Sequence, residues 1–473
     1  MLLVTKFGGS SVSTGEGHRQ VASIVAGHLA NGHRVCVVVS AMGDTTDHLV
    51  EACHRAQKGD VASLPHFLGR LQSSHEEAVR AAVERPLARE GVLAAIRPLF
   101  LELEKVLTGI AYVGEVTPRA QDLVLSFGER LSAPILAGAL ADRGIDAKAF
   151  TGKDAGIVTD STFGAARPLA DVSRHQVRGT LLPVLERGGA GNASSLVPVV
   201  TGYIAADQHG NTTTLGRSGS DYTATLLGAW LLADEIDIYS DVDGLMTADP
   251  RIVPEAKLIP ELSFAEAMEM AYFGAKMMHP LALETAFEPG IPVRIRSTFK
   301  PDNPGTIVLR DAKPSPGKIV KAITLIRDVS MVTVSGAGMA GIPGTAARVF
   351  DVLGKQRVNV LMMSQGSSEV NITFVVPRAS LDRCVNALEL ALLGGGVVEE
   401  VSSEDDASII AAVGEGMKGT HGVAARIFGA VAKADVNVRM IAQGSSELNV
   451  SFVVMQSQAP AAVKALHEAF SLG

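Results

Sequence analysis

The chain has 473 residues, and at roughly 150 residues per domain this length suggests about three domains. Hydrophobic residues make up 47% and charged residues 19%, which excludes a disordered chain, because such a chain would be poorer in apolar side chains and richer in charge. The 42 basic and 50 acidic side chains give a net charge of −8, which disfavours binding to nucleic-acid phosphates.

The cysteines and the apolar runs indicate the cellular compartment of the protein. Cys36, Cys53 and Cys384 are odd in number and widely spaced, which fits neither a disulfide framework nor a metal-binding knuckle. Lys6 interrupts the N-terminal apolar run too early for a signal peptide, and we find no apolar run of about 18 residues that would span a membrane. The sequence therefore predicts a cytoplasmic protein.

Residues 1–310 alternate between strand patterns and helix patterns. Apolar or alternating runs predict strands at 2–7, 34–40, 198–204 and 235–241. The second of these is apolar almost throughout, which is typical of a strand that is buried on both faces of a parallel sheet. Strands that alternate with helices predict an α/β fold, with a parallel-type central sheet and helices on both faces.

Two helical regions and a linker complete this part of the chain. Residues 18–32 predict a helix that places four aliphatic side chains on one face and ends at Gly32. Residues 64–140 are mostly helical and charged, and we interpret them as an elaboration over the sheet edge. Residues 311–318, DAKPSPGK, are the best linker candidate.

The last third of the chain contains an internal repeat. Aligning residues 331–376 with 409–454, an offset of 409 − 331 = 78, gives 23 identities in 46 positions. A period this long indicates a duplicated small domain, because solenoid repeats run about 20 to 50 residues. Each copy begins with a strand, a glycine-rich loop and an amphipathic helix, and two strands and a second helix follow. This order predicts ferredoxin-like βαββαβ units.

The two copies differ at their ends. A strand near 397–401 closes the first copy, whereas the second copy ends in a helix at 459–470 without a closing strand. A spare strand-like segment, residues 321–328, precedes the first copy. We therefore predict that residues 321–328 supply the missing edge of the second unit and that the two copies are intertwined.

The first candidate site is the glycine turn KFGGSS, which follows the first strand from Lys6 to Ser11. Backbone N–H groups in such a turn can approach a phosphate closely, with an ammonium and hydroxyls beside them. It matches neither the Walker A pattern nor the Rossmann fingerprint. The same residues would also suit a plain turn after an edge strand.

The second candidate is GRSGSDYTA, from Gly216 to Ala224, which leads into a predicted helix. Asp221 near the helix start can cap it and lies favourably against the helix dipole. Arg217, in a loop of small residues at a strand–helix junction, suits bidentate recognition of a carboxylate or phosphate.

Two further motifs follow. SDVDGLMTADPR, from Ser240 to Arg251, begins where a predicted strand ends, and open α/β sheets bind ligands at the carboxyl ends of their strands. GAKMMHP, from Gly274 to Pro280, offers a lysine, and we expect Pro280 to end or kink the preceding helix just after Lys276. His279 is expected to make a local hydrogen bond and not to be a ligand.

Taken in this order, with SAMGDTTD at 40–47, these motifs resemble those of the aspartate kinases, which are members of the amino-acid kinase superfamily. The tandem repeat resembles their paired ACT regulatory domains. The resemblance covers nearly the whole chain. It implies an amino-acid kinase catalytic domain at 1–310, a linker and candidate strand of the second ACT unit at 311–328, and ACT domains at 329–403 and 404–473.

By this resemblance the chain transfers the γ-phosphoryl group of ATP, bound with Mg²⁺, to the side-chain carboxylate of L-aspartate. The product is 4-phospho-L-aspartate, which opens the routes to lysine, threonine and methionine. The aspartate carboxylate has a reference pKa near 3.9 and is ionised at neutral pH, so the reaction needs no general base. The protein has to supply positioning and positive charge.

The resemblance also implies the site residues. The catalytic pair is Lys6 and Asp221. The aspartate-binding residues are Thr46, Glu129, Arg217 and Ser220, although Glu129 could also be a surface charge paired with Arg130. The ATP-binding residues are Lys6, Phe7, Gly8, Gly9, Ser10, Ser240, Asp241, Met246, Arg251, Lys276 and Met277. The family often has an aromatic residue where Met246 stands, so the adenine contact at this position stays open. No metal ligand is assigned.

ACT domains commonly pair side by side and bind an amino acid where the loop before the first helix meets the neighbour. This implies effector contacts at Met339, Ile342, Gly344, Thr345, Asn359, Val360, Ser364 and Gln365 in the first copy, and at Met417 and Asn437 in the second. The effector is lysine, threonine, both or none, and the repeats could equally serve only for dimerisation. We expect a homo-oligomer, dimer or tetramer, through the ACT domains.

Two other functions stay open. An amino-acid-kinase-fold enzyme for glutamate, carbamate or uridylate would lack the doubled ACT module and the combination of Thr46, Glu129 and Arg217. A non-catalytic amino-acid sensor would not need Lys6 and Asp221. We expect no fused homoserine dehydrogenase, because no dinucleotide fingerprint follows the repeats.

Overall fold

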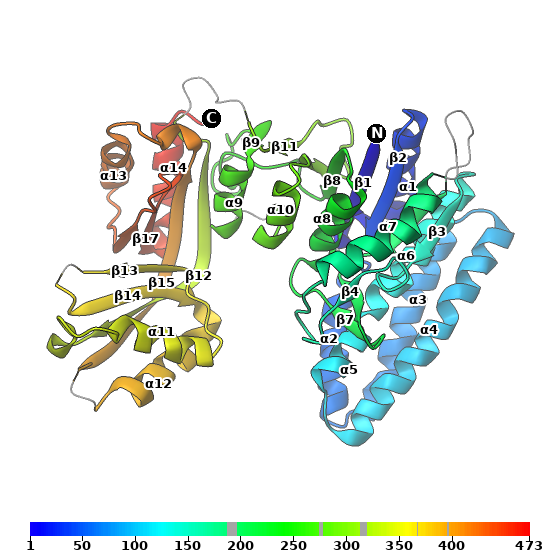
Figure 1. Cartoon of the computed structure of the whole chain (residues 1–473), viewed down its shortest axis with the longest axis horizontal. Coiled ribbons are helices and arrows are strands. Elements are labelled where there is room, and N and C mark those ends of the chain that lie inside the picture. The colour runs from blue at the N-terminus through cyan, green and yellow to red at the C-terminus, as the bar shows by residue number, and fades with distance from the viewer. Residues whose placement is uncertain (187–195, 274–277, 313–318, 367, 395–396) are drawn as a thin grey trace. The chain divides into compact units, whose positions relative to one another are not determined.

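The protein was analysed as a computed structural model, which describes residues 1–473 apart from 187–195, 274–277, 313–318, 367 and 395–396. Most of the predicted linker, residues 311–318, therefore lies outside the described residues. The chain divides into two compact units (Figure 1). The first comprises residues 1–245, 260–264 and 277–312, and the second comprises residues 246–259, 265–276 and 313–473.

An eight-stranded sheet forms the centre of the first unit, in the order β3–β5–β2–β1–β8–β10–β11–β9. Neighbouring strands are parallel except β10 and β11. The strands are β1 (Leu2–Phe7), β2 (Arg34–Val39), β3 (Ala147–Phe150), β5 (Val197–Thr201), β8 (Glu235–Ser240), β9 (Glu261–Ser263), β10 (Val293–Ser297) and β11 (Thr306–Leu309). This confirms the predicted α/β class and the strands at 2–7, 34–40 and 235–241.

The predicted strand at 198–204 is divided in two. β5 ends at Thr201, and β6 (Ile204–Asp207) joins a separate three-stranded sheet with β4 (Val158–Thr159) and β7 (Thr212–Thr214). The break falls at Tyr203, whose φ of +66° is incompatible with a continuing strand. The apolar run on both sides of Gly202 concealed this turn.

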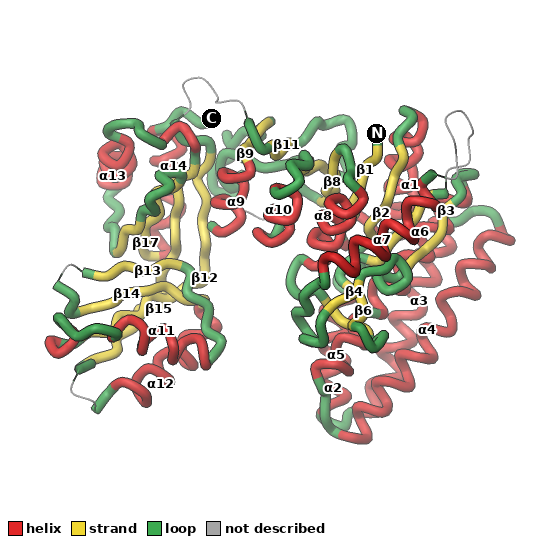
Figure 2. Tube along the Cα trace, viewed as in Figure 1, coloured by secondary structure: helices red, strands yellow, loops and turns green. Residues whose placement is uncertain are grey.

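Helices pack on both faces of the main sheet (Figures 1 and 2). α1, α6, α7 and α8 contact strands of this sheet. The helices of the first unit are α1 (Gly15–Ala30), α2 (Thr45–Gln57), α3 (Leu64–Ala82), α4 (Pro86–Val113), α5 (Pro118–Leu125), α6 (Phe127–Asp142), α7 (Ala170–Leu185), α8 (Gly219–Leu231) and α10 (Pro280–Phe287). The helix predicted at 18–32 begins three residues earlier, because the Thr14 side chain accepts the Gly17 N–H at 3.1 Å. Gly32 follows the helix in the left-handed region, with a φ of +78°.

The interpretation of residues 64–140 as an elaboration over the sheet edge is wrong. α6 packs directly on β3 and β5, and α3 and α4 pack on α1 and α6 in one continuous core. The combined helical stretch Pro118–Asp142 is long and apolar enough to cross a membrane, but 78% of its apolar window is buried inside the protein. It is therefore a core element, and its buried apolar side chains account for its composition.

A six-stranded antiparallel sheet forms the second unit, in the order β13–β14–β12–β15–β17–β16. The strands are β12 (Ala322–Ser335), β13 (Met362–Gln365), β14 (Asn371–Pro377), β15 (Glu400–Val413), β16 (Met440–Ala442) and β17 (Asn449–Met455). The helices are α11 (Thr345–Lys355) and α12 (Leu381–Leu392) in the first copy, and α13 (Val423–Lys433) and α14 (Ala459–Ala469) in the second.

The two copies of the repeat are intertwined, as predicted. β12 is one long strand: residues 323–326 pair with 409–412 of the second copy, and residues 331–335 pair with 400–404, which close the first copy. Each of the two central strands therefore serves both copies. The missing closing strand of the second copy is supplied from before the first, which makes the pair one folding unit.

Two segments from the kinase-like part of the sequence belong to this second unit. One is the loop 246–259, and the other is residues 265–276, which include most of α9 (Phe264–Tyr272). Ala248, Ile252 and Val253 lie in the same core cluster as α13 and α14. Pro280 does not end α9 but begins α10, and His279 accepts the Leu281 N–H, as expected of a local hydrogen-bonding residue.

Candidate active site

The glycine turn follows β1 at the centre of the parallel sheet. Gly8 donates its N–H to the Tyr239 carbonyl at 3.1 Å, and Gly9 begins a short 3₁₀ helix, Gly9–Val12. A Cβ at position 8 would lie 3.3 Å from Lys6 Nζ, and one at position 9 would lie 3.0 Å from the Gly43 carbonyl. Side chains at these positions would press on the lysine and on the neighbouring loop, so glycine keeps the turn open for a ligand.

Lys6 and Asp221 form an ion pair with a distance of 2.7 Å between Nζ and Oδ1. Asp221 lies in the first turn of α8, and both side chains are largely buried, at 11% and 13% exposed. Asp221 therefore orients the lysine, in addition to lying favourably at the helix N-terminus.

These two side chains line a cavity of about 600 Å³. Six of the predicted catalytic and aspartate-binding residues line it together: Lys6, Thr46, Glu129, Arg217, Ser220 and Asp221. They come from β1, the first turn of α2, the start of α6, and the loop before α8 with its first turn. The structure thus brings together residues that are up to 215 positions apart, since 221 − 6 = 215.

Glu129 is the most unusual of these side chains. It is 3% exposed, its Oε1 accepts the Ala41 N–H at 3.2 Å, and its Oε2 has no partner among the described residues. Burial raises the pKa of Glu129 to about 8, although the hydrogen bond from Ala41 lowers it. The alternative pairing with Arg130 is wrong, because Arg130 binds Glu102 at 2.7 Å. A buried carboxyl group with a free oxygen calls for a cationic or hydrogen-donating ligand.

The close approach of Glu129 to Ala41 depends on its neighbour. A Cβ on Gly128 would lie 2.7 Å from the Ala41 Cβ and 3.7 Å from Thr46 Oγ1. Only glycine therefore lets the loop before α2 come close enough to donate its N–H to Glu129.

Two further glycines, Gly202 and Gly219, allow the turn after β5 to pack closely against the start of α8, where Ser220 lies. A Cβ on Gly202 would lie 2.5 Å from Ser220 Oγ, and a Cβ on Gly219 would lie 2.7 Å from the Tyr203 ring. Tyr203 donates its N–H to Thr223 Oγ1 at 3.1 Å, which fixes the turn against α8. Arg217 is exposed and faces the cavity from the loop before the helix.

The predicted nucleotide residues are only partly brought together. Phe7 is fully buried and stacks on Tyr239 with 4.7 Å between ring centroids, so its side chain cannot reach a ligand. Ser10 is exposed beside the turn. Ser240 and Asp241 lie where β8 ends, and the Ser240 carbonyl accepts the Thr298 N–H at 2.9 Å.

The outcome differs for the four other predicted nucleotide residues. Met246 and Arg251 belong to the second unit, where Arg251 forms an ion pair with Asp249 at 2.7 Å. Lys276 and Met277 lie outside the described residues. The roles of these four stay predictions.

Nine further residues that line the cavity had no role assigned from the sequence: Ser40, Ala41, Gly43, Asp47, Gly164, Tyr203, Gly216, Ser218 and Gly219. All of them except Gly164 and Tyr203 lie within the motifs at 40–47 and 216–224. The glycine that follows β5 at position 202 is the signal that could have found Tyr203, because β1, which carries Lys6, also ends at a glycine turn. Asp122 gave no signal, because it is a single acid inside a helix. Its buried carboxylate accepts N–H groups from Gly164 at 3.0 Å and Thr214 at 2.9 Å, and so it fixes two loops beside the cavity.

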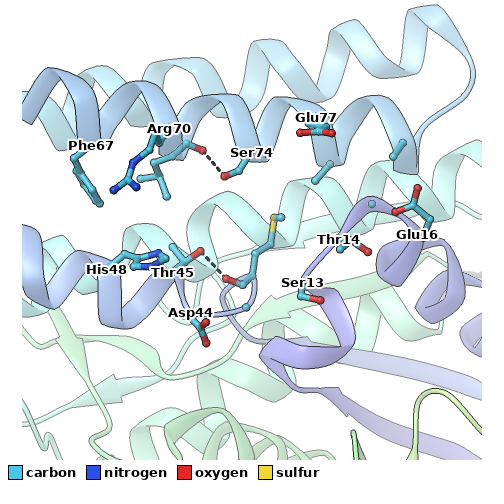
Figure 3. A pocket seen from close by; sticks show the side chains of 16 residues that line it. Ser13, Thr14, Glu16, Asp44, Thr45, His48, Phe67, Arg70, Ser74 and Glu77 are labelled. Atoms are coloured by element: carbon cyan, nitrogen blue, oxygen red, sulfur yellow. Dashed lines mark hydrogen bonds between the residues drawn. The ribbon is translucent and has the colours of Figure 1, made fainter.

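Residues 42–45 also line a second cavity of about 490 Å³ (Figure 3). Its lining includes Arg70 and Glu77 from α3, and His48 from α2. Gly43 lines both cavities. The described part of the chain contains no group of three or more His, Cys, Asp or Glu side chains that could hold a metal ion.

The predicted effector residues lie in the second unit, around two equivalent loops. Met339 and Met417 are buried in the copies' cores, and Gly344 and Gly422 begin α11 and α13 with φ values of +86° and +83°. Ile342 and Thr345 lie at the loop end, where Thr345 Oγ1 donates to the Ile342 carbonyl at 3.0 Å. The other five residues, Asn359, Val360, Ser364 and Gln365 in the first copy and Asn437 in the second, are exposed or half-buried.

The parallel sheet and its charged, glycine-lined cavity define a group-transfer enzyme fold with a regulatory module. Residues 1–297 match the amino acid kinase family, and residues 332–392 and 410–470 match the ACT domain. The chain is 34% identical over 474 residues to aspartokinase 2, chloroplastic, of Arabidopsis thaliana, covering 99% of this chain and 84% of that protein. The chain therefore belongs to the amino acid kinase family, in its aspartokinase branch with paired ACT domains.

Other relatives agree with this placement. The chain is 35% identical over 476 residues to the bifunctional aspartokinase/homoserine dehydrogenase 1, chloroplastic, of Arabidopsis thaliana, and it spans 51% of that protein. It thus covers about half the length of the bifunctional relatives that it matches. The crystal structure of E. coli aspartokinase III in complex with aspartate and ADP (R-state) superposes with a TM-score of 0.82 at 28% identity, covering 99% of both chains.

Proposed function

We propose that the chain is an aspartate kinase, which transfers the γ-phosphoryl group of ATP to the side-chain carboxylate of L-aspartate as the first step towards lysine, threonine and methionine. The observation that carries this proposal is the free, buried Oε2 of Glu129 in the same cavity as Lys6 and Arg217. An α-amino acid with an acidic side chain offers one ammonium and two carboxylates, which match one buried acid and two cations. E. coli aspartokinase III, whose structure is similar, was crystallised in complex with aspartate and ADP.

Each residue has a role in this proposal. Glu129 takes the substrate ammonium, Arg217 takes the α-carboxylate, and Thr46 and Ser220 donate hydroxyl hydrogen bonds. Lys6, oriented by Asp221, stabilises the charge that develops on the transferred phosphoryl oxygens. The reacting carboxylate is already ionised at neutral pH, so no side chain has to remove a proton.

Mg²⁺ enters this proposal with ATP. Mg²⁺ usually keeps several waters and binds through one or two carboxylates and the substrate phosphates, so it does not require a cluster of protein ligands. Omitting Mg²⁺ from the assay should therefore abolish product formation, and adding it back should restore the full rate.

The test is a hydroxamate assay for acyl phosphate with ATP, Mg²⁺ and L-aspartate. We expect product from aspartate and none from L-glutamate, because the longer side chain would misplace its carboxylate. No product, or equal product from glutamate, would contradict the proposal.

Regulation, assembly and location belong to the same proposal. An amino-acid effector at the ACT domains, lysine or threonine, is supported by the E. coli enzyme, which was also crystallised with lysine and aspartate (T-state). Titrating the activity with each amino acid tests the effector, and light scattering on the purified protein tests whether it is a homo-oligomer.

A cytoplasmic location is also part of the proposal, and cell fractionation tests it. The family matches fall inside the proposed boundaries 1–310, 329–403 and 404–473.

A further inference from the structure

The two ACT copies hold their glycine-rich loops, residues 336–344 and 414–422, in nearly the same way. Two hydrogen bonds from the loop backbone recur at the offset of 78 residues. In the first, Gly336 donates its N–H to the Val370 carbonyl at 3.0 Å, as Gly414 does to the Leu448 carbonyl at 3.0 Å. In the second, Gly341 donates its N–H to Glu369 Oε2 at 3.0 Å, as Gly419 does to Glu447 Oε2 at 2.7 Å. The loops are therefore equivalent in backbone structure.

The side chain that accepts one loop N–H differs between them. In the first copy, Glu399 accepts the Ala337 N–H at 3.2 Å. In the second copy, the equivalent N–H belongs to Glu415, and it is accepted at 2.9 Å by Glu266 of α9. The first loop is held by a side chain of its own copy, whereas the second is held by a side chain from the kinase-family sequence.

The reason is a change of charge at one equivalent position. Lys321 stands where Glu399 stands in the first copy, since 399 − 321 = 78. The backbone confirms the equivalence: Glu399 donates its N–H to Ser335 O at 2.9 Å, and Lys321 donates its N–H to Val413 O at 2.8 Å. A lysine ammonium has no acceptor, so Lys321 cannot hold the loop N–H as Glu399 does.

Both carboxylate oxygens of Glu266 make contacts here, and one of them is the acceptor that Lys321 cannot provide. Its Oε2 pairs with Lys321 Nζ at 2.7 Å, and its Oε1 accepts the Glu415 N–H. The Lys321 side chain is 6% exposed and that of Glu266 is 0% exposed. The second loop is thus complete only with a residue of α9.

Other contacts tie the same part of the sequence to the second copy. Thr247 accepts the Ile323 N–H at 2.8 Å, and its Oγ1 lies 3.0 Å from His467 Nε2. Asn449 donates to Glu269. Thr247 follows β8 in the chain and Glu266 follows β9, so both tethers begin next to strands of the catalytic sheet.

We propose that Glu266 is a positioning residue that couples nucleotide binding to the loop 414–422 of the second ACT copy, and that the loop 336–344 of the first copy lacks this coupling. A movement of α9 on nucleotide binding changes the acceptor of the Glu415 N–H but not the acceptor of the Ala337 N–H. Coupling between two sites is reciprocal, so a ligand on the second loop would act back on the nucleotide. The proposal rests on nucleotide use by this kinase family and not on aspartate as the substrate.

Hydrogen–deuterium exchange on the full chain tests it, with and without saturating ADP and Mg²⁺. We expect exchange in peptides that contain residue 415 to change about fivefold or more, which is the lower end of typical allosteric coupling, and peptides that contain residue 337 to change less than about twofold. Equal changes in both loops, or no change in the second loop with ADP bound, would overturn the proposal. Failure of ADP to bind, measured by calorimetry, would overturn it as well, whereas failure of the aspartate assay alone would not.

A double variant removes the coupling and keeps the loop bond. In Lys321→Glu with Glu266→Gln, the new carboxylate stands where Glu399 does and can accept the Glu415 N–H within the second copy. We expect ADP binding to be retained and the response of the second loop to fall below about twofold. Glu399→Gln is the matched control, and it should leave the response of the second loop unchanged. An unchanged response in the double variant would contradict the role of Glu266, and the wild-type exchange result decides the proposal even if this variant does not fold.

Discussion

Among the described residues, each unit of the molecule contains one buried lysine–carboxylate pair, and the two pairs have the same separation. Lys6 lies 2.7 Å from Asp221 in the first unit, and Lys321 lies 2.7 Å from Glu266 in the second. The exposed fractions of the side chains are 11% and 13% in the first pair, and 6% and 0% in the second. The first pair faces a cavity, whereas the second is buried between α9 and the start of β12.

This difference shows that the distance between ammonium and carboxylate does not decide whether a buried ion pair serves ligand binding or structure. Asp221 and Lys6 can exchange partners with a ligand, because the cavity gives a phosphate access to the ammonium. Glu266 and Lys321 have no such access, and so their interaction serves structure and coupling. We therefore expect loss of Lys6 to reduce catalysis and loss of Lys321 to reduce stability.

The largest effect is expected at the first pair. Lys6→Met should lower kcat by about 10²–10³-fold, because it removes a charge aimed at the transferring phosphoryl group. The free energy of unfolding should change little, since the remaining Asp221 carboxylate faces the cavity and can be hydrated. The hydroxamate assay and thermal unfolding measure the two quantities, and Lys105→Met, at an exposed position of α4, is the control. More than a tenth of the wild-type rate in Lys6→Met would remove Lys6 from the mechanism.

The second pair should show the opposite result. Lys321→Met removes the ammonium beside the buried Glu266 carboxylate, and breaking a buried ion pair in this way costs about 3–5 kcal/mol of folding free energy. Adding Glu266→Gln should recover most of this loss, because no buried charge remains. Urea unfolding measures both. A loss below about 1 kcal/mol in the single variant would show that the pair is not sealed as its exposure indicates.

Glu129 tests the catalytic side further. Glu129→Gln keeps the acceptor for the Ala41 N–H but removes the charge opposite the substrate ammonium. Loss of one partner from a buried charge pair costs about 2 kcal/mol or more, so KM for aspartate should rise roughly 30-fold or more. We expect a smaller change in kcat, because Glu129 does not act on the transferring group. Steady-state kinetics separates the two, and an unchanged KM would exclude Glu129 from the substrate site.

The pH dependence follows from the same group. Burial raises the pKa of Glu129 from 4.5 to about 8, so the carboxyl is protonated at pH 6 in the free protein. Binding of an ammonium requires the ionised form, so KM for aspartate should fall as pH rises from 6 to 8, by at most about tenfold per unit. A raised acid pKa in the folded state also means that stability falls as pH rises from about 4.5 to 8. Both trends should disappear in Glu129→Gln, and a flat KM profile in the wild type would contradict the assignment.

The sequence predicted the parts of the molecule that depend on local pattern. The apolar run 34–39 and the turn at Lys6 showed where the sheet and its ligand edge lie, and the offset of 78 residues showed the duplicated domain. The spare strand before the first copy also predicted the intertwining. The second copy lacks a closing strand of its own, so another segment of the chain has to supply one.

What the sequence could not show depends on contacts between distant residues. Glu129 lies in an ordinary helix pattern, and its burial and its free oxygen result from the approach of Ala41, 88 positions earlier. The role of Glu266 depends on the opposite charges of Lys321 and Glu399, which only the backbone equivalence of the two copies makes visible. Tyr203 was misplaced in a strand because its positive φ has no signal beyond the preceding glycine.

The smallest expected effect comes from a pair on the surface, and it isolates burial as the deciding variable. Lys355 and Asp351 pair at 2.7 Å in α11, the same distance as in the two buried pairs, but their side chains are 73% and 60% exposed. The equivalent positions of α13 are Lys433 and Gly429, so Lys433 has the same helix-end position without the acid. Lys355→Ala should therefore destabilise the protein by only about 0.3–0.5 kcal/mol more than Lys433→Ala, and this excess should vanish in 1 M salt. An excess above about 1 kcal/mol that persists in salt would show that separation, and not burial, decides the strength of these lysine pairs.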